Sequence, residues 1–116
     1  MRKISLFIKD ILENIKKTED FVAGMSFETF KTDEKTNYAL IRCIEIIGEA
    51  TKRVPDDIKQ AYPEIPWRDM AGMRDKLIHF YFGLHVEKIW LVVVEDLPKI
   101  KPRLEKVQSD LENRNI

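Results

Sequence analysis

The residues best suited to chemistry lie in the stretch that contains one of the chain's two histidines, His79. Arg74, His79 and Tyr81 form the pattern R-x4-H-x-Y. Histidine exchanges protons near neutral pH, and arginine keeps its charge and forks onto phosphate oxygens. On a helix, positions 74 and 79 lie roughly 140° apart. Asp75 and His79, four residues apart, share a face, so Asp75 can hydrogen-bond His79 and fix its tautomer.

The same residues also fit an ordinary structural role. Asp75 and His79 can form a helix-surface pair worth about 0.2–0.5 kcal/mol. Arg74 can be an ion-pair partner, and Tyr81 a core aromatic with its hydroxyl at the rim. Spacing alone leaves both interpretations open, because an arginine and a histidine often share one helix.

A second candidate is the carboxylate pair Glu45 and Glu49, which share a helix face and could bind metal or transfer protons. Arg42 and Lys52 flank the pair, which favours a self-compensated polar stripe. The single Cys43 excludes a cysteine-based zinc site, and the histidines lack H-x-H or H-E-x-x-H spacing. We therefore expect no metal and no cofactor.

Helical periodicity supplies the elements that position these residues. Apolar side chains recur at steps of three and four over residues 4–15. Ser26 is a suitable cap for a short helical piece, and Asp33 for a long helix that runs to about Arg53. That long helix is apolar around most of its circumference, which is typical of the central helix of a bundle. Gly48 within it would allow another helix to approach closely.

The second half of the chain is helical as well. After a proline-rich connection with one short turn, a helix begins near Pro66 and is broken or bent at Gly83. A further helix covers residues 89–97 and is expected to stop at Pro98. A last helix covers residues 100–111. The sequence predicts an all-α bundle of about five helices that forms a single domain over residues 1–116.

Composition narrows the function. The 116 residues contain 20 Lys plus Arg and 20 Asp plus Glu, for a net charge of +0. This balance argues against a broad polybasic nucleic-acid binder, although it leaves room for a small phosphate site. The longest stretch without charged residues, 77–86, is about half of a membrane span, so no membrane segment is expected. The lone cysteine suggests a reducing, cytoplasmic setting.

Several segments in the same order resemble a known family. The run Pro-Trp-Arg-Asp-Met-Ala-Gly-Met-Arg at 66–74, continuing to His-Phe-Tyr-Phe at 79–82, resembles the signature of the HepT-like HEPN family. Ile-Ile-Gly-Glu-Ala at 46–50 resembles its central helix, and Asp-Ile at 10–11 fits its first helix. Because the resemblance reaches Glu49, it makes this residue a further candidate for the catalytic cleft. The resemblance implies a bundle of four to five helices that dimerises. It also implies a ribonuclease toxin paired with a small nucleotidyltransferase antitoxin of the MntA type.

The family motif carries over onto this sequence without a departure. The resemblance implies that Arg74 and His79 are the nuclease pair, contributed by both subunits of a homodimer to a shared cleft for RNA. It implies that Tyr81 is the hydroxyl that the antitoxin modifies with adenylate. Cleavage without metal needs a proton acceptor, a proton donor and charge stabilisation at phosphorus, which these residue types provide. The alternatives are a non-catalytic helical partner that presents substrate to a nucleotidyltransferase, and a structural dimer with a silent motif.

Overall fold

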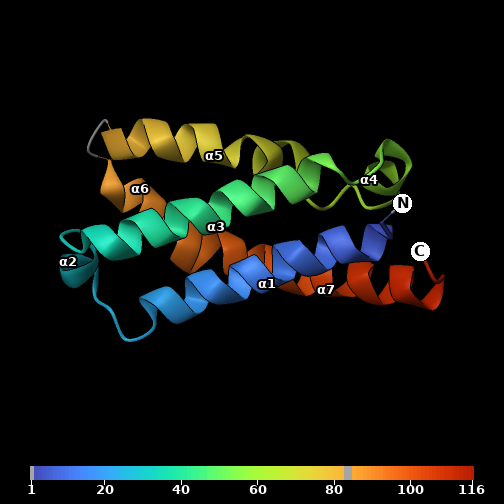
Figure 1. The fold of residues 1–116 in the computed structure, drawn as a ribbon, viewed down its shortest axis with the longest axis horizontal. Coiled ribbons are helices and arrows are strands. Elements are labelled where there is room, and N and C mark those ends of the chain that lie inside the picture. The colour runs from blue at the N-terminus through green and yellow to red at the C-terminus, as the bar shows by residue number, and fades with distance from the viewer. Residues whose placement is uncertain (1, 83–84) are drawn as a thin grey trace.

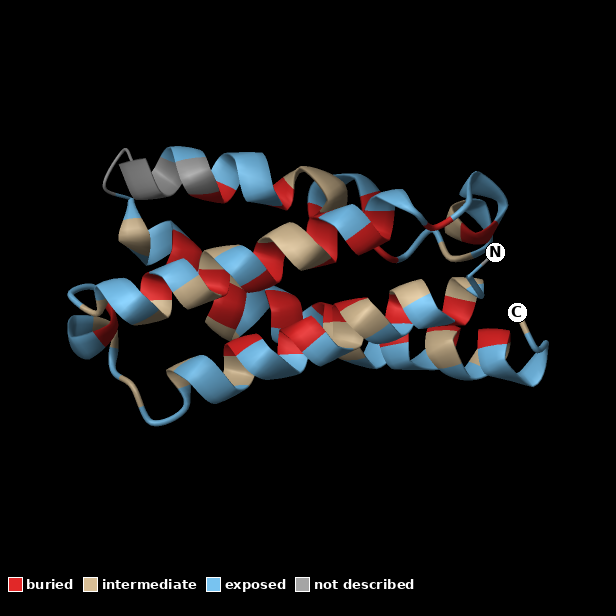
Figure 2. Cartoon of the chain, in the orientation of Figure 1, coloured by how far each residue is buried: buried red, intermediate tan, exposed pale blue. Residues whose placement is uncertain are grey.

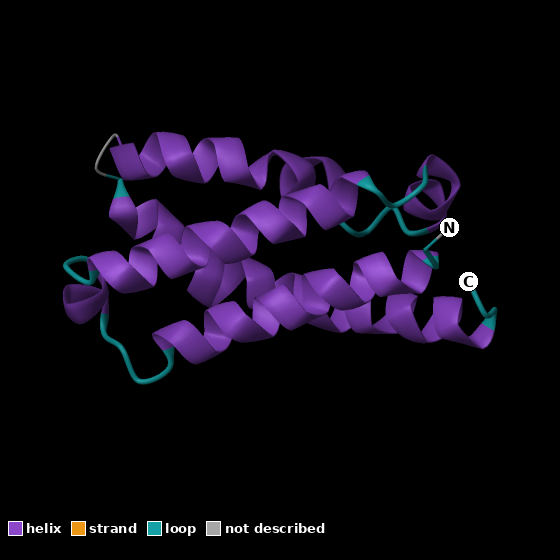
Figure 3. Cartoon of the chain, in the orientation of Figure 1, coloured by secondary structure: helices purple, strands orange, loops and turns teal. Residues whose placement is uncertain are grey.

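The computed structural model describes residues 2–82 and 85–116, without the side chains of Ile78, Phe80, Tyr81 and Phe82. All of its regular elements are helical, and the described residues form no strand (Figure 3). In chain order they are α1 (Ile4–Val22), α2 (Phe27–Phe30), α3 (Glu34–Lys52), α4 (Asp56–Ala61), α5 (Trp67–Phe82), α6 (Val86–Leu91), the π-helical η1 (Val92–Asp96) and α7 (Leu97–Asn113). The predicted all-α class is confirmed.

Long helices run side by side, with α3 packed between α1 and α5 (Figure 1). The α7 helix packs against α1, and the short α2 and α4 lie at opposite ends of the bundle. Both chain ends meet at the α4 end, where the amide of Ser5 donates to the carbonyl of Ile116 at 3.2 Å. The central position predicted for the helix that contains Gly48 is therefore confirmed.

Local sequence signals explain where several helices begin. The hydroxyl oxygen of Ser26 accepts from the amide of Thr29 at 3.2 Å, and an Asp33 carboxylate oxygen accepts from the amide of Thr36 at 3.0 Å. The second bond lowers the pKa of Asp33, because it stabilises the charged form. Both predicted caps are confirmed. The α5 helix follows Pro66 directly, as expected for a proline beside a helix start.

The core lies where the apolar faces of α1, α3, α5 and α7 meet, and buried positions follow the facing sides of these helices (Figure 2). At the α2 end, the Phe30 ring lies 4.9 Å from the Trp90 ring, centroid to centroid. Trp67 is also buried. Trp90 is partly buried and packs against the same core.

One predicted boundary is wrong. Pro98 does not stop a helix, because α6, η1 and α7 form one continuous helical segment from Val86 to Asn113. In the widened π turn, the amide of Leu97 donates to the carbonyl of Val92. Pro98 then follows as the second residue of α7, and the chain stays helical through it. Gly83, the other predicted break, lies outside the described residues.

No helix in the described ranges is long and apolar enough to cross a membrane.

Candidate functional site

Gly48 is the point where α3 and α5 come closest. A Cβ atom built on Gly48 would lie 3.3 Å from the carbonyl oxygen of Ala71 and 3.6 Å from that of Met70. Any side chain at this position would press on the backbone of α5, so only glycine allows this approach without a shift. The close contact predicted for Gly48 is confirmed, and it fixes which residues of the two helices face each other.

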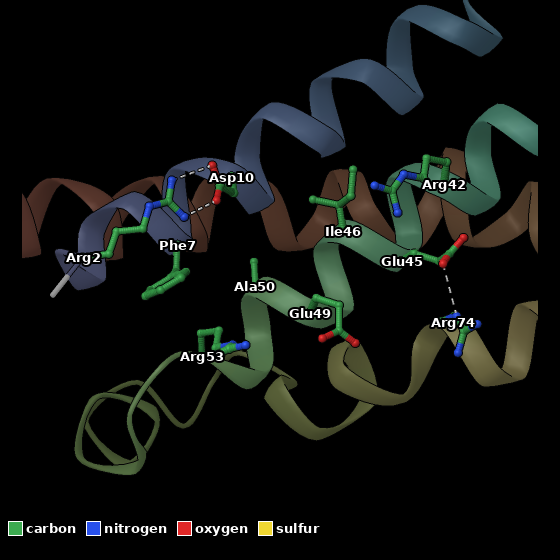
Figure 4. A pocket seen from close by; sticks show the side chains of 10 residues that line it. All are labelled: Arg2, Phe7, Asp10, Arg42, Glu45, Ile46, Glu49, Ala50, Arg53 and Arg74. Atoms are coloured by element: carbon green, nitrogen blue, oxygen red, sulfur yellow. Dashed lines mark hydrogen bonds and ion pairs between the residues drawn. The ribbon is translucent and has the colours of Figure 1, made fainter.

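Arg74 is positioned by this contact. The two helices run antiparallel (Figure 1). Arg74 comes three residues after Ala71, and Glu45 comes three residues before Gly48. In antiparallel helices these two positions lie at the same level. Arg74 Nε accordingly lies 3.4 Å from Glu45 Oε2 (Figure 4). The guanidinium also lies 3.7 Å from an oxygen of Asp75. Arg74 is nevertheless 48% exposed, so its guanidinium stays accessible to a ligand.

His79 lies in the last turn of α5 and is exposed. Arg74 and His79 occupy one regular α-helix, so their directions around its axis differ by roughly 140°. One chain therefore does not gather them on one face. Asp75 and His79 are one turn apart as expected, and orientation of His79 by Asp75 stays a prediction. Tyr81 belongs to the same helix, but its side chain lies outside the described part of the chain.

The two candidate glutamates differ in their contacts. Glu49 Oε1 lies 3.4 Å from Lys52 Nζ on the same helix, which confirms that part of the polar stripe. Glu45 instead reaches across to Arg74 on another helix. The sequence interpretation placed Glu45 in the self-compensated stripe and missed this role. The spacing from Gly48 was the signal that could have revealed it.

A groove of about 530 Å³ lies beside this ion pair. The α3 helix lines it with Arg42, Glu45, Ile46, Glu49 and Ala50, and Arg53, the residue that caps the C-terminal end of α3, lines it as well. The remaining lining residues are Arg74 from α5, and Arg2, Phe7 and Asp10 from the start of the chain (Figure 4). Four arginines therefore line one groove in a protein of zero net charge.

Arg2 forms part of the groove wall. Its guanidinium donates two bonds to Asp10, of 2.6 and 3.2 Å, and lies 5.0 Å from the Phe7 ring centroid. The bond to Asp10 raises the pKa of Arg2, because it favours the charged form. This bidentate contact and the ring fix the position of Arg2.

Metal-binding side chains are not grouped in this region. Within residues 2–82 and 85–116, no three His, Cys, Asp or Glu side chains are placed to hold a metal ion together. Cys43 is buried on α3, and burial raises the pKa of its thiol.

Comparison with known proteins assigns the family. The model of the family described as "Ribonuclease HepT-like" matches residues 11–107. This chain belongs to the HepT-like family. The match includes the whole R-x4-H-x-Y motif and the α3 and α5 residues of the groove, whereas Arg2, Phe7 and Asp10 precede it.

Relatives of this HepT-like chain carry ribonuclease names. A protein of Thermococcus cleftensis named "Probable ribonuclease HepT" is 51% identical over 103 residues, which cover 89% of this chain and 94% of that protein. A protein of Methanocaldococcus jannaschii named as a "Putative RNase" is 43% identical over 114 residues, which cover 98% of this chain and 94% of that protein. A second one from the same organism is 42% identical over equal coverage. No solved structure matches the chain.

Proposed function

We propose that this HepT-like protein is an endoribonuclease that works without a metal ion and acts as a homodimer. The main support for this proposal is the intact R-x4-H-x-Y motif in a chain of this family, with Arg74 and His79 both exposed on α5. The ribonuclease names of the relatives support RNA as the substrate.

The motif residues can perform the cleavage by general acid–base catalysis. A neutral His79 takes the proton from a ribose 2′-hydroxyl, whose oxygen then attacks the adjacent phosphorus. The bond from phosphorus to the 5′-oxygen breaks, and a protonated imidazole delivers a proton to that leaving oxygen. Arg74 stabilises the charge that builds up on the phosphoryl oxygens. The products are a 2′,3′-cyclic phosphate and a 5′-hydroxyl.

A dimer would supply both imidazoles. One chain contributes a single histidine to the motif, and Arg74 and His79 point in different directions from α5. The main packing partners of α5 are α3 and α6, so this helix lies at the edge of the bundle (Figure 1). Packing of two copies along this edge would bring His79 and the partner's His79 to one cleft, with an arginine from each chain.

The test is RNA cleavage by the purified protein in EDTA. We expect the parent to cleave, and His79→Ala to lose about 100-fold or more in rate, the usual value of one acid–base group. Arg74→Ala should lose about as much, the cost of one preorganised charge-stabilising donor. His85→Ala is the matched control, because His85 is exposed outside the motif, and it should cleave at the parental rate. Folding is checked by circular dichroism, and the dimer by light scattering.

Two outcomes would contradict this function. Folded Arg74→Ala and His79→Ala proteins that cleave as fast as the parent would show that the motif is not the active site. A parent protein without any cleavage would favour the alternative, a non-catalytic helical partner of a nucleotidyltransferase.

We also propose that the protein is a toxin whose partner, a nucleotidyltransferase antitoxin of the MntA type, adenylylates Tyr81. Tyr81 lies two residues beyond His79 on α5, so a modification there would place bulk and negative charge near the position of the RNA phosphate. Incubation with that enzyme and ATP should increase the intact mass and abolish cleavage. A mass increase that persists in Tyr81→Phe would rule out this acceptor.

A further inference from the structure

We propose that the groove along α3 binds the phosphodiester backbone of single-stranded RNA, with Arg42 and Arg53 as its phosphate-binding residues. The groove would guide the strand toward Arg74, which lies at the Arg42 end (Figure 4). This inference rests on the proposed function, because the strand in the groove is the substrate of the same site.

The first reason is the state of the four groove arginines. Arg2 is engaged by Asp10, and Arg74 by Glu45. Arg42 and Arg53 are both exposed, and no carboxylate of the described residues lies within ion-pair distance of either. Two guanidinium groups in the groove are therefore available to a ligand.

The second reason is that the groove carboxylates are already matched. Asp10 lies 2.6 Å from Arg2, Glu45 lies 3.4 Å from Arg74, and Glu49 lies 3.4 Å from Lys52. The two charged groove residues without a partner, Arg42 and Arg53, are both positive, which favours an anionic ligand. A guanidinium forks onto two phosphate oxygens, so two such groups suit a strand with a repeated phosphate.

The third reason is the shape of the surface between the two arginines. Arg42 lies on α3, and Arg53 caps its C-terminal end eleven residues later. The two positions are therefore about 16 Å apart along the helix axis, which is too far for a single phosphate group to span. Ile46 and Ala50 lie between them in the lining of the groove (Figure 4). This apolar strip can contact ribose and base faces without reading a sequence. An extended strand fits this arrangement better than a small anion does.

Three basic residues outside the groove are engaged by other groups. In the basic stretch of α7, Lys101 contacts Glu19 at 2.9 Å, Lys106 contacts Asp110 at 3.3 Å, and Arg103 donates to a backbone carbonyl. Lys99 on the same helix is exposed and has no carboxylate partner among the described residues. It lies outside the groove, which makes it a suitable control.

The experiment measures binding of a fluorescent, fully 2′-O-methylated RNA dodecamer as a function of salt concentration. This RNA cannot be cleaved through its 2′-oxygen, so binding is separated from catalysis. Each phosphate contact to a single strand contributes about 0.7 to the slope of log affinity against log salt. The double variant Arg42→Ala/Arg53→Ala should therefore lower the slope by about 1.4. The variant Arg42→Lys/Arg53→Lys keeps both positive charges and should therefore keep the parental slope. Lys99→Ala should also bind with the parental slope.

The outcomes separate this inference from the proposed function. If the double alanine variant keeps the slope of the parent and the parent cleaves RNA, the groove assignment is overturned and the proposed nuclease function stands. A parent that binds the RNA with the expected loss of slope in the variant, yet cleaves no RNA, would support the groove and refute the nuclease. A folded parent that binds no RNA would refute both.

Discussion

Arg74 and Glu45 face each other across the contact between α5 and α3, with Arg74 Nε 3.4 Å from Glu45 Oε2. The register that brings them together is set at Gly48, where α3 approaches the carbonyl of Ala71. The arginine proposed to stabilise the RNA phosphate is thus held by a carboxylate in the free protein. Such a carboxylate orients the guanidinium and also competes with phosphate for it.

Glu45→Gln tests this competition. The amide keeps the size of the side chain and an accepting oxygen but removes the negative charge beside Arg74. We expect tighter binding of non-cleavable RNA by at most about fivefold, because an exposed ion pair is worth about 0.2–1 kcal/mol. Glu105→Gln, at an exposed position of α7 outside the groove, is the matched control. Weaker RNA binding in Glu45→Gln would show that orientation of Arg74 outweighs competition.

The two helical glycines near the site should respond differently to alanine. Gly72 on α5 has nothing within 4 Å of a built Cβ, so Gly72→Ala should raise the free energy of unfolding by about 0.5–1 kcal/mol. Gly48→Ala places its Cβ 3.3 Å from a backbone oxygen, and the resulting strain should cancel that gain or exceed it. Urea denaturation of both variants measures the difference. Equal stabilisation by both substitutions would contradict the close contact at Gly48.

Much of the fold was predictable because its signals are local. The caps at Ser26 and Asp33 depend on a side chain and an amide three residues away, and both formed as expected. Pro98 was misjudged because its effect depends on the neighbouring turn. The π turn lies directly before it, and the helix continues through Pro98 instead of ending there.

The site was only partly predictable for a similar reason. The motif residues were visible as a pattern, and their placement on one helix followed from periodicity. The contact of Arg74 with Glu45 depends on the register between two helices, which residue spacing within one helix does not reveal. The participation of Arg2 in the groove depends on how its side chain reaches along α1 to Asp10.

Tyr62 and Asp110 form a contact that should make stability depend on pH at both extremes. The Tyr62 hydroxyl donates to Asp110 at 2.8 Å and ties the connection before α5 to α7. This bond lowers the pKa of Asp110 below 3.8 and raises the pKa of Tyr62 above 10.0. Its contribution is lost as pH falls from 3.8 through the lower folded-state pKa of Asp110. It is also lost as pH rises from 10.0 through the higher folded-state pKa of Tyr62.

Thermal unfolding of the parent and Tyr62→Phe across the pH range checks this expectation. The gap in stability between the two proteins should be widest between these limits and should narrow at both ends. A double-mutant cycle with Asp110→Asn at neutral pH isolates the pair, because Lys106 also contacts Asp110 at 3.3 Å. A stability gap that stays constant at every pH would mean that the Tyr62 hydroxyl does not act through the charge of Asp110.

Arg74→Lys separates the charge of Arg74 from its shape. Lysine keeps the positive charge but presents a point donor in place of the planar fork, which suits two phosphoryl oxygens at once. If Arg74 stabilises the charge that develops on the phosphoryl group, kcat for RNA cleavage should fall by about 100-fold, the cost of one preorganised donor. Binding of the non-cleavable RNA should change little, because the lysine ammonium group still contacts the phosphate with one positive charge. Lys76→Arg, an exposed position two residues along α5, controls for exchange of the two residue types. If Arg74→Lys instead lost RNA binding and kept kcat, Arg74 would be a residue that holds the strand and takes no part in the chemical step.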